Sequence, residues 1–439
     1  MDTEMINDKV SQGIMLISAE KYDAAKKVFE EIISEAPRTL EAYIHLGNAC
    51  ANLEQYSEAI EAFKKALLVD PNYAEAYFSI GSIYVLMNEK VKAVEFYNKA
   101  EENGFVSSQM YQIMASIFFE AEDEPQALRN ISRAINLDPF NGELRLLKTK
   151  IYLAFNRFEQ ALESLDEMEK VLPDSFDIYD VKSQILLGQE RYTEALEVIN
   201  KGCSRFPKDY NLANIKLKIL IQSNLDAEAH KWIDYMKSEG LFSNVIKDAS
   251  INEATLLIKE NKIENACKAL LEANNQVGDD PDLLYLIVDI YGKTAQNEKL
   301  LTYSAKLMNE EYGIFYYSTA LFFHATALEA TGNVSEAKKE FKNITIKMRK
   351  ATINDPSFYE GYLYRLLSHV KIKEYDKALD LAEYIENLYP EKADAHAFRY
   401  FIFKEMGNSE EAKKERDLAK SMNPNLDIQY NPSSTEYQD

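Results

Sequence analysis

The stretch that decides the fold is residues 40–73, LEAYIHLGNACANLEQYSEAIEAFKKALLVDPNY. The spacing of its apolar residues predicts two amphipathic helices. The apolar faces of these helices carry Tyr43, Leu46, Gly47 and Cys50 in the first and Ala59, Phe63 and Ala66 in the second. Asp70-Pro71 ends the unit, because the residue before a proline resists the α conformation. The stretch therefore predicts one helical hairpin.

The same hairpin pattern recurs along the chain at a fixed spacing. Seven alanines stand 34 residues apart, at Ala25, Ala59, Ala93, Ala127, Ala161, Ala195 and Ala229. Three glycines keep the same spacing, at Gly13, Gly47 and Gly81. A bulky apolar residue follows each of these ladder alanines by four positions, as Phe63 follows Ala59. A repeat of this length with two helices per unit predicts a solenoid of stacked hairpins.

The repeated positions resemble those of the tetratricopeptide repeat, a helix–turn–helix unit of about 34 residues. The matching residues in the founding stretch are Tyr43, Leu46, Gly47, Ala59, Phe63, Ala66 and Pro71. Cys50 stands where the family usually has an aromatic residue. The resemblance covers nearly the whole chain in about twelve repeats. It implies an all-α fold, a right-handed α-α superhelical solenoid of tetratricopeptide repeats.

Small residues are expected where the two helices of one unit cross. Gly47 and Ala59 occupy this crossing in the founding stretch, so the helix axes can approach to the short end of the usual separation of about 8–10 Å. Phe63 is expected to fill the space beside the contact. The repeat thus predicts a close helix pair with one large side chain packed over it.

The strict phase ends after the seventh unit. The next ladder position is Ala266, which is 37 residues beyond Ala229, so three extra residues fall within residues 240–248. The later ladder positions are spaced less evenly, at Leu300, Ala337, Ala378 and Ala412. The tenth unit is expected to have an extended second helix. The slip predicts either a hinge at residues 241–247 or one continuous superhelix with a longer turn.

These observations predict three segments. The first is an N-terminal array of seven repeats over residues 6–243. The second is a C-terminal array of about five looser repeats over residues 247–424, which ends in a polar cap because Arg416 replaces an apolar residue. The third is a disordered tail over residues 425–439.

The composition indicates a protein of the cytoplasm. The 439 residues include 72 Asp and Glu against 50 Lys and Arg, and the net charge of −22 opposes binding to nucleic acid or anionic membranes. No signal peptide core and no apolar run of about 20 residues is present, so no membrane insertion is expected. Three separated cysteines, Cys50, Cys203 and Cys267, suggest neither a disulfide framework nor a zinc site. The Asn- and Lys-rich, Trp-poor usage indicates an AT-rich genome and a bacterial origin.

The sequence contains no motif for catalysis. A glycine-rich phosphate loop, a paired-His zinc motif and a nucleophile elbow are all missing. No two of the five histidines stand three or four residues apart, and structural roles are favoured for His45, His230, His324, His369 and His396. Carboxylates are scattered at helical spacing over solvent faces. We therefore predict no enzymatic activity, no cofactor and no metal.

The resemblance implies a binding surface, because first helices line the concave side of such superhelices and bind peptides there. The repeat register places on that side Ile44, His45, Asn48, Phe78, Ser82, Gln112, Ser116, Asn214, Lys218, Tyr285, Asp289, Phe322, Phe323, Leu363, Tyr364, Leu367, Phe398 and Phe401. The C-terminal part of this set is rich in aromatic residues, which are typical of exposed binding surfaces. The alternative for any one residue is a core position misplaced by the looser register.

A protein or peptide partner follows from this surface. We predict a non-catalytic protein–protein interaction scaffold or adaptor that binds an extended peptide or helix in the concave groove. The alternative is a peptide-sensing regulator whose superhelix changes curvature on binding. Chaperone-binding family members clamp a C-terminal carboxylate with Lys, Asn and Arg, but the corresponding positions here lack the cations. These positions are Val10, Ile14, His45, Glu75 and Ser79. The sequence does not predict the oligomeric state.

One basic cluster is unusual in so acidic a chain. Its members are Lys338, Lys339, Lys342, Lys347, Arg349 and Lys350. The cluster is expected either to be a solvated helix face or to form a small docking site for an acidic partner.

Overall fold

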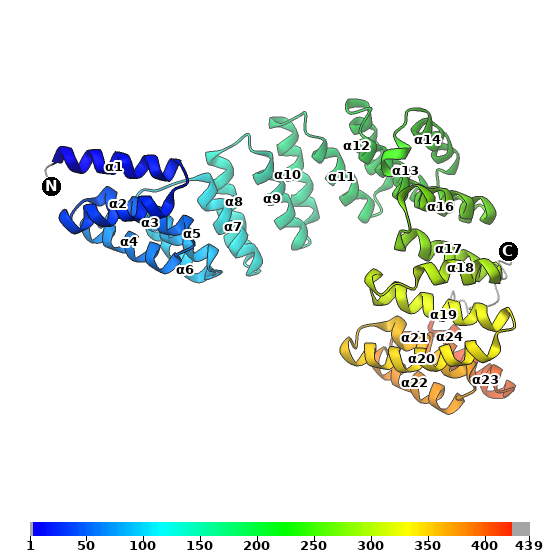
Figure 1. The fold of residues 1–439 in the computed structure, drawn as a ribbon. Helices are drawn as coiled ribbons and strands as arrows, with labels where there is room; N and C mark the ends of the chain where they lie inside the picture. The colour runs from blue at the N-terminus through cyan, green and yellow to red at the C-terminus, as the bar shows by residue number, and fades with distance from the viewer. Residues whose placement is uncertain (1–2, 424–439) are drawn as a thin grey trace. The chain divides into compact units, whose positions relative to one another are not determined.

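The computed structural model describes residues 3–423, and all regular secondary structure in this range is helical (Figure 1). Twenty-four α-helices follow one another as twelve consecutive pairs. The helices form two compact units, which lie within residues 1–198 and 199–439. The predicted all-α solenoid of about twelve repeats is confirmed. The predicted tail at residues 425–439 lies outside the described residues.

The first unit contains the first five strictly periodic repeats and most of the sixth. Its helix pairs are α1 (Thr3–Ser18) and α2 (Tyr22–Glu35), α3 (Leu40–Asn52) and α4 (Tyr56–Val69), α5 (Ala74–Leu86) and α6 (Lys90–Glu102), α7 (Ser108–Glu120) and α8 (Glu124–Leu137), and α9 (Gly142–Ala154) and α10 (Phe158–Val171). The sixth pair is α11 (Phe176–Gly188) and α12 (Tyr192–Arg205), and the division between the two units falls within α12.

The ladder residues form the helix crossings, as predicted. All seven ladder alanines are fully buried: Ala25, Ala59, Ala93, Ala127, Ala161, Ala195 and Ala229. Gly47 lies directly under the ring of Phe63, and a Cβ added there would come within 2.7–2.8 Å of three ring atoms. Gly81 lies in the same way under Tyr97. The absence of a side chain therefore allows the large ring of the second helix to close the pair.

Each turn between the two helices of a pair has one residue with positive φ. These residues are Glu20, Glu54, Asn88, Glu122, Asn156, Glu190, Asn224, Asn261, Ala295, Gly332, Lys373 and Gly407. In the second pair the Gln55 N–H donates to the Cys50 carbonyl at 2.9 Å and the Glu54 N–H donates to the Ala51 carbonyl at 3.0 Å. This is the Schellman arrangement, which satisfies the last carbonyls of a helix. Sequence reasoning did not single out these turn residues.

The second unit contains the seventh strictly periodic repeat, the looser repeats and two short 3-10 helices. Its elements are α13 (Tyr210–Gln222), α14 (Asp226–Ser238), η1 (Phe242–Val245), α15 (Ile246–Lys259), α16 (Ile263–Val277), α17 (Pro281–Lys293), α18 (Asn297–Leu307), η2 (Glu310–Tyr312), α19 (Ile314–Ala330), α20 (Val334–Asn354), α21 (Tyr359–Lys371), α22 (Tyr375–Leu388), α23 (Asp394–Glu405) and α24 (Ser409–Met422). The three-residue slip corresponds to η1. The extended second helix predicted for the tenth unit is α20, with 21 residues.

The predicted boundary between the two arrays, near residues 243–247, lies at η1 within the second unit. The division into those arrays and the hinge at residues 241–247 stay predictions. Among residues 3–423, no helix combines the length and the apolar character needed to cross a bilayer.

Candidate partner-binding site

In the first unit the predicted surface lies on α3, α5 and α7. All of its residues are half-buried: Ile44, His45, Asn48, Phe78, Ser82, Gln112 and Ser116. The His45 ring stacks on Phe29 of the preceding pair with 5.4 Å between ring centroids, and burial lowers the pKa of His45. Phe78 stacks on Phe105 at 4.5 Å. These side chains are therefore partly held by their neighbours while keeping one side open.

Two amide side chains on this surface are available for hydrogen bonds with a ligand. The side chains of Asn48 and Gln112 make no hydrogen bond within the described part of the chain. By contrast, the Ser82 and Ser116 hydroxyls donate back to the carbonyls of Phe78 and Gln112, at 3.0 and 3.1 Å. Each free amide offers both donors and an acceptor to a ligand.

In the second unit six of the predicted residues reach the surface. They are Asn214, Lys218, Tyr285, Asp289, Phe323 and Phe401, of which Lys218 is exposed and the others are half-buried. Asn214 accepts a hydrogen bond from the Asn252 amide at 3.0 Å, which links α13 to the next first helix, α15. Tyr285 packs on Phe315 with 5.3 Å between ring centroids, and burial raises its pKa.

The other five predicted residues are buried, so the prediction that they are exposed is wrong. They are Phe322, Leu363, Tyr364, Leu367 and Phe398, and all belong to one hydrophobic core. Phe322 lies 5.2 Å from Tyr364 and 5.9 Å from Phe341 between ring centroids. The reason is that α19 packs directly against the first helices on both sides, α17 and α21. Side chains of adjacent first helices therefore fill the space that would have been surface.

The histidines have structural partners. His324, His369 and His396 each place Nδ1 within 2.7–2.9 Å of a glutamate, and His230 places Nε2 3.0 Å from Glu260. Burial lowers the pKa of His369, although its contact with Glu374 acts in the opposite direction. Among residues 3–423, no three His, Cys, Asp or Glu side chains are grouped so as to hold a metal.

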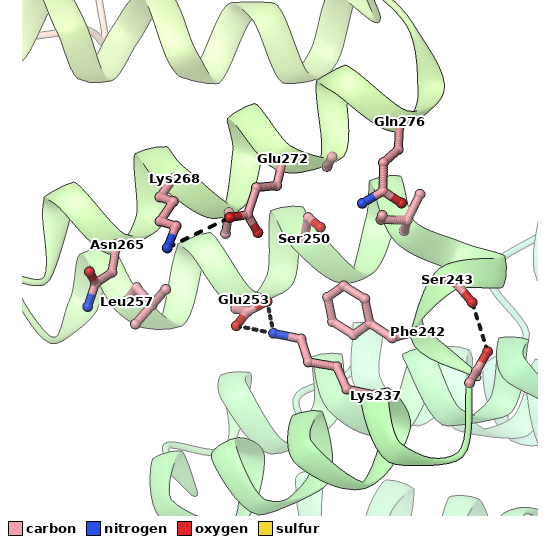
Figure 2. A pocket seen from close by; sticks show the side chains of 14 residues that line it. Lys237, Phe242, Ser243, Ser250, Glu253, Leu257, Asn265, Lys268, Glu272 and Gln276 are labelled. Atoms are coloured by element: carbon pink, nitrogen blue, oxygen red, sulfur yellow. Dashed lines mark hydrogen bonds and ion pairs between the residues drawn. The ribbon is translucent and has the colours of Figure 1, made fainter.

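Two grooves of the second unit are lined by none of the predicted surface residues. The first, the insertion groove, has a volume of about 500 Å³ and lies among α14, η1, α15 and α16 (Figure 2). Its charged side chains pair with one another. Lys237 Nζ lies 2.7 Å from Glu253, and Lys268 lies 3.8 Å from Glu272, as Figure 2 shows. The insertion groove therefore carries no surplus charge from these residues.

The second groove, the basic groove, has a volume of about 900 Å³ and lies among α20, α21 and α22. Three of its cations, Lys342, Arg349 and Arg365, make no ion pair within residues 3–423. The Nε of Arg365 is buried without an acceptor among the described residues. Burial and the charge of Arg349 lower the pKa of Arg365. Sequence reasoning noticed Lys342 and Arg349 but missed Arg365, because that residue is an isolated cation on a neighbouring helix.

Stacked pairs of antiparallel helices define the class of the protein as an α-solenoid. Sequence models of two repeat families match it: "TPR repeat" at residues 47–88, and "Tetratricopeptide repeat" at residues 11–67 and 146–210. The chain is a tetratricopeptide-repeat protein. A search of curated proteins finds no match.

Several solved structures are similar to this chain at low sequence identity. YrrB, described as a TPR protein with an unusual peptide-binding site, is 21% identical over 42% of this chain and 95% of its own, with a TM-score of 0.35. A structure of Naa15/Naa10 bound to HypK-THB is 16% identical over 96% of this chain and 64% of that chain, with a TM-score of 0.46. A structure of the APC/C hetero-tetramer Cut9–Hcn1 is 14% identical over 97% of this chain and 89% of that chain, with a TM-score of 0.40.

Proposed function

We propose that the protein is a non-catalytic interaction scaffold or adaptor that holds an extended peptide or helix of a partner along its first helices. The observation that carries this proposal is a pair of half-buried amides, Asn48 and Gln112, on first helices of the first unit, whose side chains form no hydrogen bond with the described residues. An amide side chain can donate to a peptide carbonyl and accept from a peptide N–H at once. Such contacts fix a peptide backbone without demanding one side-chain sequence.

The remaining open residues would supply specificity. Phe78 and Tyr285 are half-buried aromatics held by neighbouring rings, so they lose little conformational freedom on binding. Lys218 adds a charge on the surface of α13. In the first unit, the combination of two amides and an aromatic ring suits a peptide with both polar backbone and apolar side chains.

The test is a peptide selection against the full chain, followed by binding measurements with variants. Peptides selected from a random library should lose about tenfold or more in affinity for the Asn48→Ala/Gln112→Ala variant, as expected when several hydrogen bonds are removed. The matched control is Asn72→Ala/Gln160→Ala, which deletes the same two amides from exposed positions outside the first helices. Equal affinities for both variants would contradict the assignment of the site.

The same peptides separate a scaffold from a peptide-sensing regulator. A scaffold should keep its radius of gyration when a saturating peptide is added, because binding uses a preformed surface. A regulator that changes curvature should change its radius of gyration in solution X-ray scattering. A clear change in the radius of gyration would show that the protein is a peptide-sensing regulator and not a scaffold.

A further inference from the structure

The basic groove differs from the rest of the molecule in its charge. The chain as a whole has a net charge of −22. The groove, however, is lined by four cations, Lys342, Arg349, Arg365 and Lys377, against two carboxylates, Glu374 and Asp380. An acidic protein thus concentrates positive charge at one place.

The carboxylates of the groove do not neutralise this charge. Glu374 is already engaged, because it accepts from Lys377 at 3.0 Å and lies 2.8 Å from Nδ1 of His369. Asp380 is exposed on α22. Three cations thus remain without a partner in the described residues, and Arg349 is close enough to Arg365 to disfavour its charged form. An anion between them would relieve both the repulsion and the burial of an unpaired charge.

The Nε of Arg365 is buried and has no acceptor among the described residues, so nothing there balances the charge of this guanidinium. Buried polar atoms without a partner are uncommon in folded proteins, and each one calls for an explanation. The guanidinium group presents planar pairs of donors that match a carboxylate. Because Arg365 is half-buried on α21, between α20 and α22, its position is set by packing.

Apolar side chains border these cations. Ile346 and Ile353 of α20 are 69% and 68% exposed, and Tyr384 of α22 is 49% exposed. On α20 these isoleucines alternate with the cations at helical spacing, since Lys342, Ile346, Arg349 and Ile353 lie on one face. A free inorganic anion would use only the cations. A peptide with carboxylates and apolar side chains would use the whole groove.

We infer that the basic groove binds an acidic segment of a partner protein, whose carboxylates meet Lys342, Arg349 and Arg365 and whose apolar side chains lie on Ile346 and Ile353. The site is lined by α20, α21 and α22, and none of its lining residues belongs to the predicted peptide surface. The basic cluster in the sequence contributes only partly, since Lys347 instead donates to the Tyr317 hydroxyl at 2.5 Å.

The experiment measures fluorescence anisotropy of a labelled glutamate–leucine peptide with the full chain. The peptide should bind, its affinity should fall with salt, and a glutamine–leucine peptide should bind about tenfold or more weakly. The Lys342→Glu/Arg349→Glu variant should lose about tenfold or more in affinity. The control, Lys338→Glu/Lys339→Glu, changes the same charge on the same helix outside the groove.

Arg365→Gln should also lower the affinity for the peptide by about tenfold. If this variant fails to fold, the Lys342→Glu/Arg349→Glu variant still tests the inference.

Equal losses of affinity in the Lys342→Glu/Arg349→Glu variant and its control would overturn the inference, because they would show general attraction to a basic helix. Displacement of the peptide by inorganic phosphate but not by added chloride would assign the groove to a small anion. Tighter binding of a peptide of residues 424–439 would assign it to the chain's own terminus. Either result would overturn a partner segment as the occupant.

Discussion

The same position of the repeat differs in burial between the two units. In the first unit, Phe78, which stands 15 residues before the ladder residue Ala93, is half-buried and keeps one side open. In the second unit, Phe322 stands 15 residues before the ladder residue Ala337 and is fully buried among Phe341, Tyr364 and Phe323. The difference follows from helix contact, since α19 packs against both neighbouring first helices. One repeat position can therefore be surface in one place and core in another.

The sharpest test of this comparison removes both rings. Phe322→Ala should lower the free energy of unfolding by about 3–5 kcal/mol, because it deletes a fully buried ring and leaves a cavity. Phe78→Ala should cost about 1–2 kcal/mol, since part of that ring is already in contact with water. Urea denaturation followed by far-UV circular dichroism measures both. Equal costs would show that the two positions do not differ in burial.

The strict phase of the first unit made its faces predictable from sequence. The ladder alanines and the glycines under Phe63 and Tyr97 occupy the expected crossings. The seven predicted surface residues of α3, α5 and α7 are all partly open. A fixed period repeats the same neighbours, so one correctly assigned unit assigns the others.

The second unit was less predictable, for a physical reason. An aromatic residue on a first helix gives the same sequence pattern whether it faces solvent or the next helix. Only the spacing of adjacent first helices decides, and that spacing depends on contacts between repeats. This is why Phe322 and Tyr364 were misplaced. Arg365 was missed because its role depends on cations of α20 that are adjacent only in the folded chain.

Glycine substitutions test the helix crossings of the first unit. Gly81→Ala should destabilise the protein by about 1–3 kcal/mol, because the new Cβ would lie 2.7 Å from the Tyr97 ring and 3.2 Å from the Ala93 carbonyl. Gly188→Ala is the matched change at the end of α11, where a Cβ meets nothing within 4 Å. It should stabilise by up to about 1 kcal/mol, since alanine favours the helix. Urea midpoints that shift in the same direction would contradict the close crossing.

Acid should destabilise each unit through one histidine whose pKa is lowered by burial. Burial lowers the pKa of His45 in the first unit and of His369 in the second, so unfolding takes up protons near neutral pH. The contribution of each neutral histidine to the free energy of unfolding should therefore be complete above a pH of about 6.5. It should decrease as the pH falls below this value. Replacing His45 by Phe should reduce this dependence, as measured by urea titrations at several pH values. An unchanged slope would mean that His45 is accessible to water in the folded state.

The turns between paired helices give the smallest expected effect. In the first unit these turns hold glutamate or asparagine with positive φ, whereas two turns of the second unit hold Gly332 and Gly407. A side chain costs energy in this conformation and glycine does not. Glu54→Gly, at φ 59°, should therefore stabilise the protein by about 0.5–1 kcal/mol, after the extra freedom of glycine in the unfolded chain is subtracted.

The reverse change, Gly407→Ala, should destabilise by about 1 kcal/mol although a Cβ there meets nothing within 4 Å. Its cost would therefore come from the backbone alone. Thermal unfolding of the two variants measures both signs. If Glu54→Gly is instead destabilising, the glutamate side chain contributes more to the turn than its backbone strain costs, and the turns of the two units are not equivalent.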